Sequence, residues 1–108
     1  MPAIPESTRT SLAQRLRAHA TDHWPQLAGV TVRYRAGFAY IDGRLPGGGV
    51  IPLFRLRYGG SARTWGFSLY LASHDRYEDQ VLHTGAFTGT PQEALDCAAG
   101  LYLSGPDF

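Results

Sequence analysis

The sequence predicts a single α+β domain in which two helices pack on one face of an antiparallel sheet. Segments in the middle of the chain alternate apolar and polar residues with the period of a strand, and segments with helical periodicity flank them. The connections between the alternating segments are short, so neighbouring strands should run antiparallel as a meander. The expected order is α-β-β-β-β-(β)-α, in which the fifth strand is optional.

The chain has the size and composition of one globular domain. It contains 108 residues, of which 44% are hydrophobic and 18% charged, a balance that argues against disorder. We expect a flexible arm at 1–6, a single domain at 7–104 and a short tail at 105–108. No run approaches 18 apolar residues, and the N-terminus lacks the basic and apolar regions of a signal peptide. We therefore expect no membrane span and a cytoplasmic location.

The first helix is expected between Ser7 and Trp24. Its apolar residues recur every four positions, at Leu12, Leu16 and Ala20. Either Ser7 or Ser11 could cap its N-terminus. Pro25 should end it, because proline lacks the backbone N–H and restricts the preceding residue.

Four strands are expected in the central part of the chain, at 30–35, 38–41, 50–58 and 64–73. The fourth alternates most clearly, with apolar residues at Trp65, Phe67, Leu69 and Leu71. The connection Ala36-Gly37 predicts a tight hairpin between the first two strands. Glycines at 47–49 and 59–60 mark the next two turns.

The period of two also divides each strand between the two faces of the sheet. On the face expected to lie under the helices, the first and third strands contribute Val30, Val32, Tyr34, Phe54, Leu56 and Tyr58. Their opposite sides carry Thr31, Arg33, Arg35, Leu53, Arg55 and Arg57, to which the fourth strand adds Ser68 and Tyr70. For the second strand two alternatives stay open, either Phe38 with Tyr40 or Ala39 with Ile41.

The second helix has the strongest local signal in the chain, Thr90-Pro91-Gln92-Glu93. Threonine at the N-cap, proline at N1 and glutamate at N3 together form a capping box. A stripe of apolar residues follows, at Ala94, Cys97, Ala98 and Leu101, and Gly105-Pro106 should end the helix. Before it, we expect a loop or one helical turn at 74–79 and a short edge strand at 80–83.

The basic residues are unusual in kind, because all ten are arginine and none is lysine. A genome rich in G and C would favour arginine codons, and the planar guanidinium also suits phosphate recognition. Both explanations can hold together. The net charge of +1 does not by itself predict a polyanionic partner.

A candidate binding surface follows from the second face of the sheet. It gathers four arginines and an aromatic residue, and two arginines in flanking loops could extend it: Arg33, Arg35, Arg55, Arg57, Tyr70, Arg44 and Arg63. Arginines with aromatic neighbours are the composition that follows a phosphate backbone and stacks on bases. An ordinary solvated face and a surface for protein partners or self-association are the alternatives.

Titratable residues gather in the segment from His74 to His83. His74 and Glu78 could meet on a helical turn, where His83 could complete a metal site or a histidine could act as a base. A polar surface loop is the alternative. A second histidine pair, His19 and His23, lies four residues apart on the first helix and could also form part of a metal site. The single cysteine, Cys97, is expected to be a small core residue, and neither a metal site nor a cofactor is expected.

The second half of the chain resembles a group of small actinobacterial proteins without an assigned activity. This resemblance rests on Trp65–Phe67, Tyr70–Ser73, Tyr77–Glu78, Gly89–Ala98 and Leu101–Leu103. Two other families are similar only in outline. Double-stranded-RNA-binding domains also order a helix, a meander and a helix, but they begin the last helix with lysines where this chain has Thr90–Glu93. Antitoxin domains of the HicB type enter a helix through a segment similar to Gly89–Leu95.

These observations favour a small non-enzymatic binding or accessory domain, with nucleic acid as the most concrete partner. A protein-interaction or homodimerisation module similar to an antitoxin regulator is the alternative, pairing through sheet faces or the edge near Val81. A third hypothesis is a small hydrolase or metal-dependent enzyme that uses the segment from His74 to His83.

Overall fold

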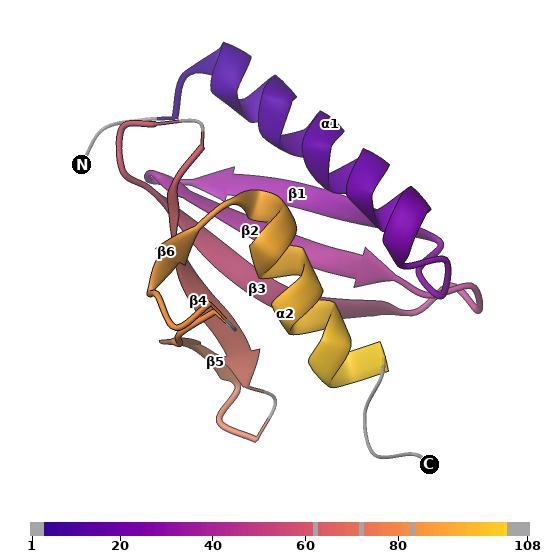
Figure 1. The fold of residues 1–108 in the computed structure, drawn as a ribbon. Helices are drawn as coiled ribbons and strands as arrows, with labels where there is room; N and C mark the ends of the chain where they lie inside the picture. Colours follow the sequence, from indigo (N-terminus) through magenta and orange to yellow (C-terminus); the bar gives the residue numbers. More distant parts are fainter. Residues whose placement is uncertain (1–3, 62, 72, 83, 104–108) are drawn as a thin grey trace.

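A computed structural model describes residues 4–61, 63–71, 73–82 and 84–103. It confirms the predicted architecture of two helices and one antiparallel sheet (Figure 1). In chain order the elements are α1 (Glu6–His23), β1 (Gly29–Arg35), β2 (Phe38–Arg44), β3 (Val50–Tyr58), β4 (Trp65–Leu71), β5 (Arg76–Asp79), β6 (Thr88–Gly89) and α2 (Pro91–Leu103). Within the described residues, no helix is long and apolar enough to cross a membrane.

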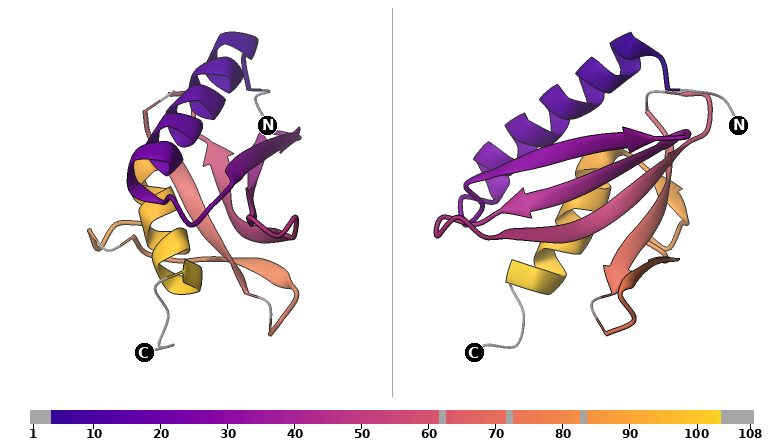
Figure 2. Two further views of the ribbon diagram at one scale, coloured as in Figure 1. Left: turned by 90° about the vertical axis from the view of Figure 1, so that its right-hand side faces the viewer. Right: turned by 180° about the vertical axis from the view of Figure 1, so that it is seen from behind.

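Both helices cover the same face of the sheet and leave the other face without a helix. Seen from behind, strands β1 to β3 lie in front and the two helices lie beyond them (Figure 2, right). The stripe predicted for α1 is buried, because Leu12, Leu16 and Ala20 are at most 4% exposed. Only one face of the sheet is therefore buried under the helices.

The start of α2 has the predicted capping box. The backbone N–H of Thr90 donates to Glu93 Oε1 at 2.9 Å, and the backbone N–H of Glu93 donates to Thr90 Oγ1 at 3.2 Å. The predicted stripe is only partly correct, because Leu101 is 57% exposed while Leu95 is fully buried. Gly105 and Pro106 lie outside the described residues.

The N-terminus of α1 differs from the prediction. The helix begins at Glu6 with Pro5 in the N-cap position, and no side chain caps it, so neither Ser7 nor Ser11 has that role. Ile4 is 4% exposed and belongs to the core, although a flexible arm was expected at 1–6. Its carbonyl accepts a hydrogen bond from Arg9 Nε at 3.1 Å, which fastens this segment to the helix.

The strand order β1-β2-β3-β4-β5 is the expected meander, with one irregularity. Between β2 and β3 the register shifts at Ile41 and Asp42, where β3 holds one extra residue. Such a bulge lets two neighbouring residues point to the same side. Leu53 and Phe54 are consequently both fully buried. The assignment of Leu53 to the arginine side was therefore wrong.

The last strands also depart from the prediction. Residues 76–79 form β5, which pairs with β4 where a loop or helical turn was expected. Gln80 to Leu82 form no strand, and His83 lies outside the described residues. The short β6 pairs with the beginning of β4, next to the position of β5 along the same edge. This arrangement leaves a gap between β5 and β6 beside Phe67.

Candidate functional site

The turn between β1 and β2 decides which residues share a face with the arginines. Ala36 and Gly37 both have positive φ, 52° and 88°, as in the tight hairpin turn that matches strand twist. This turn pairs Arg35 with Phe38 and Arg33 with Tyr40. Of the two alternatives left open by the sequence, Phe38 and Tyr40 are the pair on the arginine side.

Two cross-strand rows organise this surface, which we call the open face. Its residues are Arg33, Arg35, Phe38, Tyr40, Asp42, Arg55, Arg57, Ser68, Tyr70, Tyr77 and Asp79. One row runs across five strands as Arg33, Tyr40, Arg55, Ser68 and Asp79. The next row runs as Arg35, Phe38, Arg57, Gly66 and Thr88. Guanidinium groups thus alternate with aromatic rings across β1, β2 and β3.

The aromatic rings of the open face form a connected cluster. The ring of Tyr77 packs edge-on against Tyr40 at 5.3 Å and Tyr70 at 5.2 Å, between ring centroids. Two guanidinium carbons lie over rings, Arg33 at 5.5 Å from the Tyr40 centroid and Arg55 at 4.5 Å from the Phe38 centroid. Guanidinium groups held over rings in this way present flat, positively charged surfaces.

Asp42 lies beneath this surface and orients Arg33. The carboxylate accepts hydrogen bonds from Arg33 Nε at 3.0 Å and Nη2 at 3.4 Å. The Arg33 side chain is 61% exposed, whereas that of Asp42 is 11% exposed. The hydrogen bond to Asp42 raises the pKa of Arg33, so this guanidinium keeps its charge. Burial raises the pKa of the Tyr77 hydroxyl, with a further contribution from Asp42, so this group stays neutral at pH 7.

A second polar chain crosses from β3 to β5. Arg55 Nη2 donates to Ser68 Oγ at 3.4 Å, and the Ser68 hydroxyl donates to Asp79 Oδ1 at 2.6 Å. Arg55 Nε is buried and has no hydrogen-bond partner among the described residues. A buried donor without an acceptor is costly, so Arg55 retains an unused capacity to donate a hydrogen bond.

The other predicted arginines divide into two groups. Arg35 and Arg57 form no ion pair within the part of the chain that the structure describes. Arg44 lies at the end of β2, where its guanidinium covers Gly29 at the margin of the open face. Arg63 is exposed in the β3–β4 loop, beyond the last paired residues of those strands. The structure therefore brings together four of the six predicted arginines and sets Arg44 and Arg63 at or beyond the periphery.

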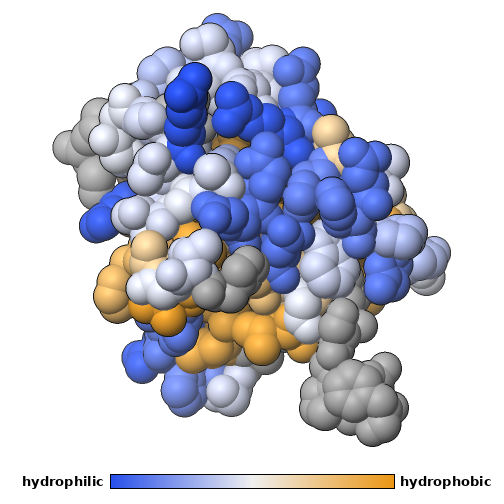
Figure 3. All heavy atoms as spheres, viewed as in Figure 1, coloured by the Kyte–Doolittle hydropathy of each residue, from blue (hydrophilic) through white to orange (hydrophobic). Residues whose placement is uncertain are grey.

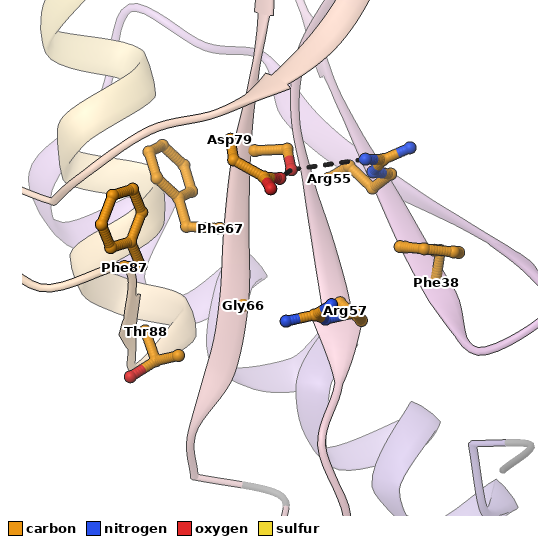
Figure 4. Close-up of a pocket in the computed structure, with 9 residues that line it drawn as sticks. Phe38, Arg55, Arg57, Gly66, Phe67, Asp79, Phe87 and Thr88 are labelled. Atoms are coloured by element: carbon orange, nitrogen blue, oxygen red, sulfur yellow. Dashed lines mark hydrogen bonds between the residues drawn. The ribbon is translucent and has the colours of Figure 1, made fainter. Parts of the chain in front are cut away.

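A pocket of about 300 Å³ opens on this side of the sheet, at the gap between β5 and β6 (Figure 4). Charged and polar groups of Arg55, Arg57, Ser68, Asp79 and Thr88 line it together with the rings of Phe38 and Phe87. Gly66 forms part of its lining, and the Arg57 side chain lies across this glycine, with Nε 3.3 Å from the place of an added Cβ. Phe87 is 61% exposed and is held by a hydrogen bond from the Phe67 N–H to its carbonyl, at 3.1 Å.

The histidine segments give no comparable site. His74 Nδ1 does contact Glu78 Oε2 at 3.0 Å, but this contact is exposed at the protein surface. Arg76 Nε also donates to that oxygen. These two partners lower the pKa of Glu78. On α1, the His19 and His23 rings lie 4.3 Å apart, and His19 Nε2 contacts Asp96 Oδ1 of α2 at 2.7 Å. Among the described residues, no three metal-binding side chains converge.

Several residues of the open face were not identified from the sequence. Asp42 lies in phase with Phe38 and Tyr40 on β2, so register could have revealed it once the turn type was recognised. Asp79, in contrast, lies in the segment that was expected to be a loop or a helical turn. Tyr77 was missed because its segment looked like a polar loop, and Phe87 because only the pairing of β6 places it at the pocket.

Comparison with protein-family models, with curated proteins and with solved structures finds no match to this chain. The resemblance to small actinobacterial proteins stays a prediction from the sequence, and no residue role is transferred from another protein.

Proposed function

We propose that this protein is a non-enzymatic binding domain that holds single-stranded nucleic acid on the open face. One observation carries the proposal: guanidinium groups and aromatic rings alternate in register across the uncovered side of three adjacent strands. Such a surface offers both elements of strand recognition, cations for phosphates and flat groups for base stacking. Cytoplasmic nucleic acid would be the natural partner.

The charges of the open face support binding of modest strength. Arg35 and Arg57 have no carboxylate partner among the described residues, so their guanidinium groups are available to phosphates. Arg33 shares its charge with Asp42, and Asp79 adds a second carboxylate. Four guanidinium groups and two carboxylates leave a small positive surplus. We therefore expect weak, salt-sensitive binding.

The aromatic rings favour a single strand over a duplex. Bases of a duplex are stacked on one another and cannot contact a flat sheet face, whereas unpaired bases can stack on rings and on guanidinium planes. Phe38, Tyr40, Tyr70 and Tyr77 are all partly exposed. The Tyr70 hydroxyl donates to Asp75, which fixes this ring at the edge of the cluster.

The proposal is tested by fluorescence anisotropy with a labelled oligothymidine at several salt concentrations. Each phosphate neutralised in a single strand contributes about −0.7 to the slope of log K against log salt concentration. If each of the four arginines neutralises one phosphate, the expected slope is about −2.8. The variant Arg35→Ala/Arg57→Ala should reduce that slope to about −1.4. Arg17→Ala is the control, because Arg17 is exposed on α1 and away from the open face. The losses are compared per charge removed, since the control removes one charge and the double variant removes two.

Two results would overturn the proposal. One is the absence of binding at about 50 mM salt, where the electrostatic contribution is strong. The other is equal loss of affinity in the Arg17→Ala control, which would show that binding depends on overall charge.

Homodimerisation or binding of a protein partner is a second candidate, supported by a different surface. Seen from the helix side, apolar surface gathers around β4, β6 and α2, whereas α1 presents a hydrophilic surface (Figure 3). Exposed apolar side chains in this part of the chain include Val81, Phe87 and Leu101. Light scattering at several protein concentrations tests it, and a monomer at all of them excludes self-association.

A further inference from the structure

The pocket between β5 and β6 holds a donor and an acceptor beside each other. Arg55 and Asp79 flank Ser68, which is hydrogen-bonded to both. Arg55 lines the pocket, and its guanidinium carries N–H groups besides the one that contacts Ser68. Asp79 accepts the Ser68 hydroxyl at Oδ1, and a carboxylate has room for further donors. A ligand that satisfies both groups must present a carbonyl oxygen next to an N–H.

The walls of the pocket suit a flat ring with a phosphate attached. The exposed ring of Phe87 lies at the rim, held in place through its backbone carbonyl. Arg57 points across the face of Gly66 towards the same opening, and Thr88 carries a hydroxyl there (Figure 4). A volume of about 300 Å³ lies at the lower end of the range for small-molecule pockets.

We propose that this pocket binds a single guanine base, with Arg57 and Thr88 contacting its phosphate. In this pose Asp79 accepts the ring N–H and the exocyclic amino group of guanine, and Arg55 donates to the adjacent carbonyl oxygen. The pocket thereby gives the open face a preference for guanine in the strand it holds. The preference for guanine within a bound nucleic-acid strand rests on the proposed function. Binding of a free guanine nucleotide does not depend on it.

Guanine is the base whose hydrogen-bonding edge matches both charged groups. Its Watson–Crick edge places a carbonyl oxygen beside two successive donors, and a carboxylate accepts two parallel donors well. Adenine and cytosine would place an acceptor ring nitrogen against the carboxylate, so no hydrogen bond could form there. Uracil and thymine match the carbonyl and the first N–H, but they place a second carbonyl where guanine has its amino group.

The first experiment is a titration of the ¹⁵N-labelled full chain with guanosine monophosphate, followed by NMR, with adenosine monophosphate as the control ligand. We expect guanosine monophosphate to shift the amide signals of Gly66, Ser68 and Thr88, and to bind about tenfold more tightly than adenosine monophosphate, the discrimination of one good bidentate pair. Equal binding of the two nucleotides, or shifts confined to other residues, would overturn the inference.

The second experiment separates this inference from the proposed function. Labelled oligothymidines with one central guanine, hypoxanthine or adenine are compared by anisotropy, with hypoxanthine expected between the other two because it lacks the amino group. Asp79→Asn should abolish the preference for guanine and, because it removes a negative charge from the open face, should raise rather than lower the affinity for plain oligothymidine. The exposed control Asp22→Asn should change neither. Phe87→Ala should weaken all guanine-dependent binding and leave the hydrogen bonds among Arg55, Ser68 and Asp79 unchanged.

The outcomes are distinguishable. Binding of oligothymidine without a guanine preference overturns the inference about the pocket and leaves the proposed function of the open face intact. Binding of guanosine monophosphate at the pocket without binding of oligonucleotides supports the inference about the pocket and overturns the proposed function.

Discussion

The two faces of the sheet are built from the same strands and have opposite properties. On the covered face, Ile41, Phe54 and Leu56 are at most 1% exposed and pack under the helices. Their immediate neighbours on the open face include Tyr40 and Arg55, which contribute a partly wet layer of rings and charges. Alternation with a period of two thus separates stability from binding within single strands. Substitutions one residue apart should therefore have different consequences.

The largest expected effect comes from comparing two phenylalanines on opposite faces. Phe54→Ala removes a fully buried ring and should lower the free energy of unfolding by about 3–5 kcal/mol. Phe38→Ala removes a half-exposed ring and should cost below about 2 kcal/mol, while weakening oligonucleotide binding. Urea unfolding of both variants measures the difference. Equal losses would mean that the open face is part of the core.

A smaller effect is expected from Asp42, which stabilises the open face and also weakens its positive charge. Asp42→Asn removes the charge that holds Arg33, and we expect a loss of about 1 kcal/mol in stability, because Arg33 is largely exposed. Affinity for oligothymidine should rise on the order of fivefold, since a unit charge about 4 Å away in water contributes about 1 kcal/mol. Unfolding and anisotropy are measured on the same sample. Weaker binding would show that oriented Arg33 matters more than net charge.

The regular part of this comparison could be predicted from the sequence. Strand alternation placed Arg33, Arg35, Arg55 and Arg57 on one side because each strand has a strict period of two. The capping box at Thr90 is local chemistry, so its residues sufficed to locate the start of α2.

The unpredicted part depends on pairing between distant segments. The bulge opposite Ile41 turns Leu53 into the core, and nothing in the sequence of β3 alone reveals it. Residues 76–79 are polar and form a strand only because β4 offers its edge. The pocket needs β4, β5 and β6 together, so Phe87 and Asp79 could not be joined in advance.

A subtler probe of the open face is Gly66, whose missing side chain makes room for Arg57. An alanine Cβ would lie 3.3 Å from Arg57 Nε, so the flexible arginine must shift by a few tenths of an ångström. Replacing a strand glycine gains roughly 0.5–1 kcal/mol in backbone entropy, and we expect Gly66→Ala to be neutral or slightly stabilising. Binding of guanosine monophosphate should nevertheless weaken, because Arg57 moves and the pocket becomes shallower. A large loss of stability in urea unfolding would contradict this account of the site.

The smallest expected effect concerns Tyr77, whose neutral hydroxyl keeps negative charge away from bound phosphates. Burial and the nearby Asp42 raise its pKa above the ordinary tyrosine value of 10.0, although Arg33 opposes them. The folded state thus holds this proton more tightly than the unfolded chain does. The resulting stability is complete below about pH 10 and is lost as the pH rises from there through the pKa of the folded state.

Titration by ultraviolet absorbance should therefore show a late tyrosine transition that becomes smaller in Tyr77→Phe. Burial also raises the pKa of Tyr34 at the margin of α1, but the charges acting on it, Arg9 and Arg17, are cationic and lower it. Tyr34→Phe is thus the matched variant, and it should leave the contribution of Asp42 intact. If Asp42→Asn shifts the late transition to lower pH in the Tyr34→Phe background, the buried carboxylate acts on the open face as its geometry implies. An unchanged transition would assign the shift to burial alone, and Tyr77 would then report how closely its ring is packed against Tyr40 and Tyr70.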